Sequence, residues 1–217
     1  MPTPTWDRLS PARRERVLVA AMDEFGTHGY STGSLNVIAR EAGVAKGSLF
    51  QYFSGKLDLF AYVAEQTSLR VYAHMRPWLD GYDGTRDFRE HLTDALEAWL
   101  DYFARQPLER GVTAASNMEM DPAVREAVRA PVNALYLAGL RPLLERAVTA
   151  QHLRKDADLD ALLSLLLVLL PHLALLPHVP GPDRPLPLTS VPPQVRRENL
   201  ERLLTPLLSD FTSRQGR

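Results

Sequence analysis

The side chains best suited to contact a nucleic acid lie between Ser34 and Phe53, in the segment SLNVIAREAGVAKGSLFQYF. From residue 46 onward this segment supplies an ammonium group, hydroxyls, an amide and aromatic rings, carried by Lys46, Ser48, Phe50, Gln51 and Tyr52. Lysine and glutamine pair with base edges in the major groove of DNA, and cations and hydroxyls bind phosphates. The segment therefore predicts a surface for double-stranded DNA.

Two short helices are expected to hold these side chains. Apolar residues recur at helical spacing in the first, at Leu35, Ile38, Ala39 and Ala42. Gly43 follows, where a left-handed residue commonly ends a helix, and Val44 is expected to turn into the core. The second helix runs from Lys46 to Phe53 with Leu49 and Phe53 inward, which leaves six residues facing outward: Lys46, Gly47, Ser48, Phe50, Gln51 and Tyr52. Such a pair predicts a helix-turn-helix, whose second helix enters the major groove.

Two further helices flank this pair. Ser10 and Pro11 form a favourable helix start, so residues 1–9 are expected to be an arm and a helix should follow. Its buried stripe is predicted at Val17, Leu18, Ala21, Met22 and Phe25, and its end between Gly26 and Gly29. A long helix is expected from Lys56 to about Met75, ended by Pro77.

The stretch RRERVLVAAMDEFGTHGYSTGSLNVIAREAGVAKGSLFQYFSGKLDLF resembles the N-terminal domain of the tetracycline-repressor (TetR) family of bacterial transcription regulators. The matching positions are Ala21, Phe25, Gly29, Tyr30, Ser34, Ile38, Ala39, Gly43, Val44, Gly47, Ser48, Leu49, Tyr52, Phe53, Lys56 and Leu59. The resemblance covers about the first quarter of the chain. It departs from the family at Gly33 and Asn36, which are often Thr and Arg.

The resemblance implies an all-α fold with a three-helix DNA-binding domain over residues 1–55 and an effector-binding and dimerisation domain over residues 56–217. It implies phosphate contacts from Tyr52 and Lys56, and Ser34 can bind a phosphate through its hydroxyl and backbone. Lys46 and Gln51 are the predicted base-contacting residues, because lysine pairs with guanine acceptors and glutamine with adenine. Asn36 is expected at the same surface, where the absence of a cation should weaken phosphate or base contacts. Gly47 would let the backbone approach the DNA, and Phe50 would meet a thymine methyl. The expected function is a cytoplasmic homodimeric repressor that a small effector releases from a palindromic operator.

Composition sets weaker bounds. The 217 residues carry a formal charge of −1, and residues up to Lys56 hold seven Lys or Arg against five Asp or Glu, so the basic bias of the N-terminal part is slight. The absence of cysteine excludes disulfides and thiolate chemistry. The six histidines have no metal-ligand spacing, and the sequence has no nucleotide-binding or hydrolase motif. Neither a metal nor a cofactor is expected.

Further helices are expected over residues 85–105, 108–120 and 121–153. Pro131 and Pro142 should kink or break the last of these. Residues 159–176 are almost wholly apolar but too short for a membrane span, so we expect a helix buried between a core and a partner subunit. Residues 177–193 hold seven of the 17 prolines and predict a loop before a final helix over 194–211. A dimer interface is predicted on the two last helices, with Leu204 and Leu208 in it.

The second domain is rich in aromatic and aliphatic side chains. An apolar effector cavity is predicted, lined by Trp99, Phe103, Met118 and Tyr136 with Asn117 and His172 as polar anchors. The effector is expected to be a hydrophobic organic molecule, uncharged or with one acidic group. A fatty acid or an acyl-coenzyme A would meet Arg105 and Arg110 at the cavity mouth.

Two other functions remain open at this point. One is a small all-α enzyme, and the other is a module that binds a protein partner through its leucine-rich last helices and has a vestigial DNA-binding domain. Each of the candidate cavity residues also suits an ordinary packed core. Salt-dependent binding to promoter DNA would separate a regulator from both alternatives.

Overall fold

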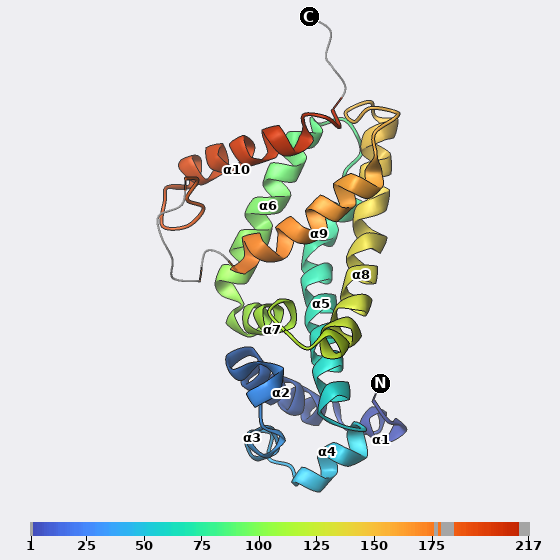
Figure 1. The fold of residues 1–217 in the computed structure, drawn as a ribbon, viewed down its shortest axis with the longest axis vertical. Helices are drawn as coiled ribbons and strands as arrows, with labels where there is room; N and C mark the ends of the chain where they lie inside the picture. The colour runs from blue at the N-terminus through green and yellow to red at the C-terminus, as the bar shows by residue number, and fades with distance from the viewer. Residues whose placement is uncertain (1, 176–177, 179–184, 213–217) are drawn as a thin grey trace, which may run out of the picture. The chain divides into compact units, whose positions relative to one another are not determined.

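The computed structural model describes residues 2–175, 178 and 185–212, which form ten helices and no strand. The first five are α1 (Pro4–Asp7), α2 (Pro11–Thr32), α3 (Leu35–Glu41), α4 (Lys46–Tyr52) and α5 (Lys56–Asp80). The others are α6 (Phe88–Arg105), α7 (Pro107–Asn117), α8 (Pro122–Thr149), α9 (Leu159–Leu175) and α10 (Pro193–Leu208), as Figure 1 shows. Residues 177 and 179–184 of the predicted proline-rich loop lie outside the described residues.

The chain forms two compact units that no single cut in the sequence separates. The first comprises Met1–Val71 and Ala104–Leu135, and the second comprises Tyr72–Phe103 and Tyr136–Arg217. The first unit therefore adds α7 and the first half of α8 to the four N-terminal helices and the start of α5. The functional division at residue 55 stays a prediction.

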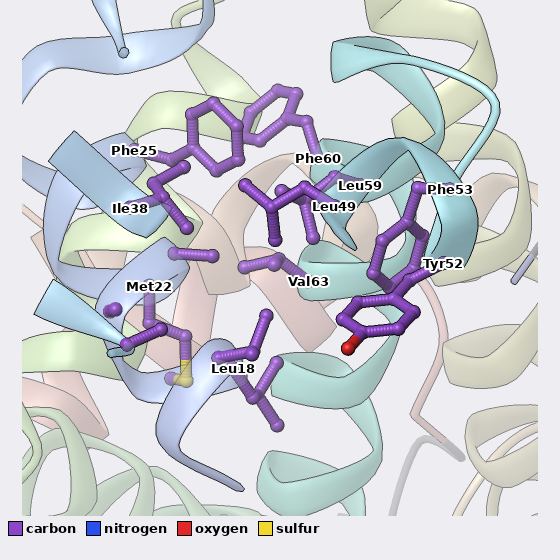
Figure 2. Close-up of a cluster of buried hydrophobic side chains, with 14 of the residues drawn as sticks. Leu18, Met22, Phe25, Ile38, Leu49, Tyr52, Phe53, Leu59, Phe60 and Val63 are labelled. Atoms are coloured by element: carbon purple, nitrogen blue, oxygen red, sulfur yellow. The ribbon is translucent and has the colours of Figure 1, made fainter. Parts of the chain in front are cut away.

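An apolar core joins α2, α3, α4 and α5 within the first unit (Figure 2). The predicted stripe of α2 is confirmed, because Val17, Leu18, Ala21, Met22 and Phe25 are all buried. The Phe25 and Phe60 rings lie 5.0 Å apart between centroids, and Ile38, Leu49 and Phe53 meet them from α3, α4 and the residue after α4. Burying such side chains contributes about 1.5–3 kcal/mol each relative to exposure.

Helix α2 crosses α7 at a contact between two glycines. A Cβ built on Gly111 would lie 3.0 Å from the Gly26 Cα, and one built on Gly26 would lie 3.1 Å from the Gly111 Cα. The two backbones thus touch, which only glycine permits on both sides. Near this crossing the Arg70 guanidinium of α5 binds Glu15 of α2 at 2.7 Å and Glu109 of α7 at 3.4 Å. One side chain therefore ties three helices together.

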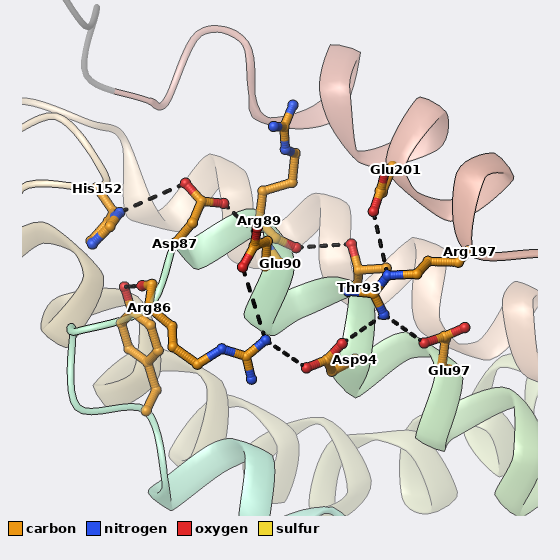
Figure 3. Close-up of polar contacts among 11 residues, drawn as sticks. Arg86, Asp87, Arg89, Glu90, Thr93, Asp94, Glu97, His152, Arg197 and Glu201 are labelled. Atoms are coloured by element: carbon orange, nitrogen blue, oxygen red, sulfur yellow. Dashed lines mark hydrogen bonds and ion pairs between the residues drawn. The ribbon is translucent and has the colours of Figure 1, made fainter. Parts of the chain in front are cut away.

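In the second unit, arginines of α10 hold that helix against α6 (Figure 3). Arg197 lies 2.7 Å from Asp94 and 2.8 Å from Glu97, and Arg196 lies 2.8 Å from Asp101. Burial acts to raise the pKa of Asp94, but hydrogen bonds from Arg197 and Arg86 outweigh it and hold that pKa below its ordinary value. Beneath these pairs Leu200, Leu204 and Leu208 are buried within the protomer.

Several predicted boundaries are wrong. Residues 1–9 contain the short helix α1, with Trp6 2% exposed, and are not simply an arm. Helix α2 continues to Thr32 across a kink at Gly29, where φ is 71°. Helix α7 ends at Asn117 and α10 at Leu208, each three residues before the predicted end.

Prolines also end fewer helices than predicted. Pro77 lies inside α5, although an internal proline removes one N–H donor and costs about 3 kcal/mol. Arg146 offers a physical reason: it donates to the Leu79 carbonyl and, at 3.1 Å, to the Tyr82 carbonyl at the end of this helix. Helix α8 runs through Pro131 and Pro142 without interruption, so the predicted break is wrong.

Helix α9 is buried on one side only. Leu162, Leu163 and Leu166 are buried, whereas Leu165 and Val168 are 44% and 66% exposed. The opposite correction applies to Leu204 and Leu208 of α10, which were predicted to lie in a dimer interface. They are 0% and 2% exposed and belong to the core of one chain. A leucine stripe cannot by itself distinguish a partner subunit from a neighbouring helix.

We expect Gly111→Val to lower the free energy of unfolding by about 1–3 kcal/mol, because extra methyl groups at a backbone contact force the helices apart. Urea denaturation followed by circular dichroism measures this loss. Gly47→Val is the matched control: Gly47 is also helical, and a Cβ there meets nothing within 4 Å. Equal urea midpoints for the two variants would contradict the close backbone contact between Gly26 and Gly111.

Candidate nucleic-acid interface

Helix α3 is fixed at its first residue by two groups. The Ser34 hydroxyl accepts a hydrogen bond from the Val37 amide at 3.5 Å, as an N-cap should. The Ser34 amide in turn donates to the Glu24 carboxylate of α2 at 2.8 Å, and Glu24 is buried. Sequence reasoning missed Glu24. Its place beside Phe25 on a buried stripe was the available signal, since acids are rarely buried without a partner.

The turn between α3 and α4 agrees with the prediction. Gly43 adopts φ 64°, and the Val44 amide donates to the Ala39 carbonyl at 2.9 Å. Ala42 is fully buried, and Val44 packs partly buried against the core. The left-handed residue turns the chain at once into α4, which fixes the angle between the two helices.

The exposed face of α4 carries the predicted base-reading residues. Lys46, Gly47, Phe50 and Gln51 are exposed, with Phe50 at 51%, while Ser48 is half-buried. Tyr52 was predicted to face outward, and this is wrong, because Tyr52 is 3% exposed. Its ring lies 5.8 Å from that of Trp6. Leu49, Tyr52 and Phe53 share one helical face at i, i+3 and i+4, so the sequence did contain the signal.

The two departures from the family occupy different environments. A Cβ on Gly33 would lie 2.7 Å from the Gly29 carbonyl oxygen and 2.8 Å from Phe25 Cδ1, so no larger residue fits there without movement. The kink at Gly29 therefore requires glycine at position 33. Asn36 is exposed on the outer face of α3, where its amide is accessible to a ligand.

Lys56 is the first residue of α5 and is half-buried, and its side chain reaches the end of α2. Its ammonium donates to the Ser31 carbonyl at 3.1 Å and lies 4.9 Å from the centre of the Tyr30 ring. Burial lowers the pKa of Lys56, and Glu24 and Glu119 partly oppose that effect. An ammonium group has three donors, so the Ser31 contact leaves capacity for a phosphate oxygen.

Ser54 and Asp58 cap the start of α5. The Ser54 hydroxyl donates to the Asp58 carboxylate, and the Ser54 amide donates to the same oxygen at 3.4 Å. The hydroxyl bond is the main reason that the pKa of Asp58 lies below its ordinary value. This cap holds α5 directly after α4 and so limits the movement of the α4 end.

The six residues predicted to line an effector cavity do not form one described site. Trp99, Phe103 and Tyr136 form an aromatic cluster in the second unit, with Trp99 4.9 Å from Phe103 and 6.1 Å from Tyr136 between ring centres. The Trp99 indole donates to the Leu170 carbonyl at 2.9 Å. Cavities of about 260 and 310 Å³ in the same unit are lined by other residues.

The other three candidates behave differently. His172 is exposed, with Nδ1 2.7 Å from the Val168 carbonyl of its own helix. Asn117 and Met118 belong to the first unit. Asn117 donates to the Thr113 carbonyl at 2.8 Å, and Met118 is 65% exposed. The prediction that His172 and Met118 lie in an apolar interior is therefore wrong.

The described residues contain no group of three or more His, Cys, Asp or Glu side chains arranged to hold a metal ion. Among their helices, none combines the length and the apolar character needed to cross a membrane.

Residues 17–63 match the family described as "Bacterial regulatory proteins, tetR family". The HTH-type transcriptional activator FasR of Mycolicibacterium smegmatis is 36% identical over 90 residues, which cover 42% of this chain and 40% of FasR. The probable acrEF/envCD operon repressor of Escherichia coli K12 is 30% identical over 102 residues, which cover 46% of this chain and 44% of the repressor. In these matches the chain spans less than half the length of either relative.

Similarity of fold extends well beyond the segments that match in sequence. A putative tetR family transcription regulator from Shewanella sp. PV-4 aligns with a TM-score of 0.69 and 18% identity over 93% of this chain and 99% of that one. The predicted all-α fold, with an N-terminal helix-turn-helix and a C-terminal helical part, is confirmed. The matched family and these relatives are described as transcriptional regulators.

Proposed function

We propose that the chain is a member of the tetR family of bacterial regulatory proteins and represses transcription as a cytoplasmic homodimer, which a hydrophobic effector releases from a palindromic operator. The observation that carries this proposal is the outer face of α4, where Lys46, Phe50 and Gln51 are exposed while Leu49 and Phe53 anchor the helix. A cation, an amide and an apolar ring on one rigid helix match the contacts by which proteins read a major groove.

Roles within this surface divide by chemistry. Gln51 and Lys46 would contact base edges, Gly47 would permit close approach, and Phe50 would meet a thymine methyl. Ser34 and Lys56 would contact phosphates, with Asn36 and Ser48 beside them. The burial of Tyr52 argues against a large phosphate contact from its ring, so any contact would come from its hydroxyl.

We expect Gln51→Ala to weaken binding to a duplex selected by the wild-type chain from a random pool by about 1–3 kcal/mol and to relax preference at one base pair. Lys56→Ala should weaken all duplexes alike and reduce the salt slope by about one unit. Fluorescence anisotropy at several salt concentrations measures both effects. Gln194→Ala, an exposed glutamine in the second unit, is the matched control. Identical behaviour of the Gln51 and Lys56 variants would refute this division, and failure to enrich any duplex would favour a vestigial DNA-binding domain.

A homodimer is supported by the exposed side of α9. Leu165 and Val168 face solvent on a helix whose other side is core, and Ala161 and His172 continue the same exposed stripe. An apolar stripe on a helix commonly marks an interface, and a two-fold axis would place two such helices together. Two reading helices would then address the two half-sites of a palindrome.

We expect the double variant Leu165→Glu/Val168→Glu to be a folded monomer, because charge on both subunits opposes association while the protomer core is untouched. Light scattering at micromolar concentration measures the mass, and circular dichroism checks the fold. Leu204→Glu is the contrasting variant: it should unfold the protomer, because Leu204 is fully buried. A dimeric mass for the double variant would place the interface elsewhere.

The effector class is argued from the cluster of Trp99, Phe103 and Tyr136. Phe103 is fully buried and Tyr136 half-buried, so a ligand would enter beside Tyr136 and displace packing around Trp99. Apolar walls with a few polar atoms favour a hydrophobic molecule, uncharged or with one acidic group, such as a fatty acid or an acyl-coenzyme A. A role for Arg105 and Arg110 in binding its anionic end stays a prediction.

We expect acyl thioesters or free fatty acids to release the selected duplex, and aromatic acids and lipophilic cations to act less. Tyr136→Leu should change the concentration needed for release without changing DNA affinity in the absence of the compound. Anisotropy of a labelled duplex follows both. Release by the cations alone would overturn the proposed effector class.

A further inference from the structure

The end of α4 is held by a residue from the start of the chain. The last carbonyls of any helix lack partners within that helix. In α4, the Thr3 hydroxyl donates to the Gln51 carbonyl at 2.5 Å and the Thr3 amide donates to the Tyr52 carbonyl at 2.8 Å. Thr3 therefore caps a helix that begins more than forty residues later in the sequence.

The Thr3 side chain has no competing role in its own helix. Thr3 is the N-cap of α1, where its carbonyl accepts from the Trp6 amide at 2.9 Å, but its side chain makes no capping hydrogen bond there. Removing the hydroxyl would thus leave α1 intact and act on α4. Glu, Lys or Arg side chains are not involved, so the contact does not depend on salt.

Trp6 fixes α1 in place on both α4 and α5. It is 2% exposed, and its ring lies 4.9 Å from Phe53 and 5.4 Å from Tyr62 between centroids. Its indole N–H donates to the Tyr62 hydroxyl of α5 at 3.1 Å. Figure 1 shows α1 next to the end of α4. The short helix therefore joins the C-terminal end of α4 to the helix that follows it.

We propose that Thr3, seated by Trp6, is a positioning residue for sequence reading by α4, an inference that rests on the proposed function. Helix α4 has only seven residues, and helices that short are unstable alone, so its last turn frays unless it is held. That turn carries Phe50 and Gln51, and the Thr3 hydroxyl binds the backbone of Gln51 itself. The family match begins at residue 17 and does not include Thr3 or Trp6.

The mechanism predicts a loss of specificity rather than of general DNA binding. Sequence is read by oriented side chains, whereas non-specific binding depends on charge near the phosphates. Without the Thr3 hydroxyl, Gln51 must become ordered when DNA binds. The entropy lost in this ordering weakens only the sequence-specific complex, in which Gln51 contacts a base. Binding to random duplex does not require that order.

The test compares Thr3→Val, which is nearly isosteric and lacks the hydroxyl, with Thr3→Ser, which retains it. Thr3→Val should weaken binding to the duplex selected by the wild-type chain about fivefold, the factor expected for one neutral hydrogen bond, and leave binding to random duplex unchanged. Thr3→Ser should restore wild-type affinity. In the free protein, Thr3→Val should speed amide hydrogen exchange in residues 49–53 and leave residues 35–42 unchanged.

Each alternative outcome is distinct. Equal weakening on both duplexes, or a lower melting temperature with no change in the specificity ratio, would show that Thr3 only stabilises the fold and would overturn the inference. Unchanged binding and unchanged exchange would overturn it as well. If the wild-type chain selects no duplex, the proposed function fails and the reading role fails with it. Faster exchange in α4 would still establish the cap alone.

Discussion

The structure of the first unit depends on one constraint, which is that α3 and α4 are too short to be stable alone. Helices α3 and α4 have seven residues each, below the roughly 12–15 that an isolated helix needs in water. Neither can be stable without partners, so both depend on the apolar core built on α2 and α5. Phe25 and Phe60 form the centre of that core, and Ile38, Leu49 and Phe53 reach it from the short helices and the residue after α4 (Figure 2). The position of the outer face of α4, which we propose contacts DNA, depends on this packing.

Polar contacts then set the ends of the short helices. Glu24 holds the start of α3 through Ser34, Gly43 turns the chain between the helices, and Thr3 holds the end of α4. Each of these contacts replaces a partner that a short helix cannot supply for its own end groups. Apolar burial thus provides the stability, and the caps provide the orientation on which base reading depends.

The first unit also extends beyond the helix-turn-helix. The Gly26–Gly111 crossing and the bonds of Arg70 to Glu15 and Glu109 make α7 part of the same body as α2. In the second unit, Arg197 pairs with Asp94 and Glu97 of α6 (Figure 3), and Arg196 pairs with Asp101. These pairs hold α10 by charge as well as by apolar contact.

The sequence by itself determined the local features of this protein. Helical spacing of apolar residues located α2, α3, α4 and α6, because a helical period places a stripe on one face whatever lies opposite. Gly43 marked the turn, because its left-handed φ is a property of one residue. The outward placement of Lys46 and Gln51 followed from the same periodicity, and these are the residues that we propose contact DNA.

Only the tertiary structure decided which partner each stripe meets. Trp6, distant in sequence, is the ring that packs on Tyr52, and Leu204 is buried by its own chain while Val168 is not. Pro77 and the α8 prolines did not end their helices, because local propensity costs a few kcal/mol that packing and Arg146 offset. The groups that Glu24 and Thr3 bind, the Ser34 amide and the Gln51 carbonyl, were equally hidden. Contacts between residues far apart in the chain leave no spacing pattern, so a single sequence does not record them.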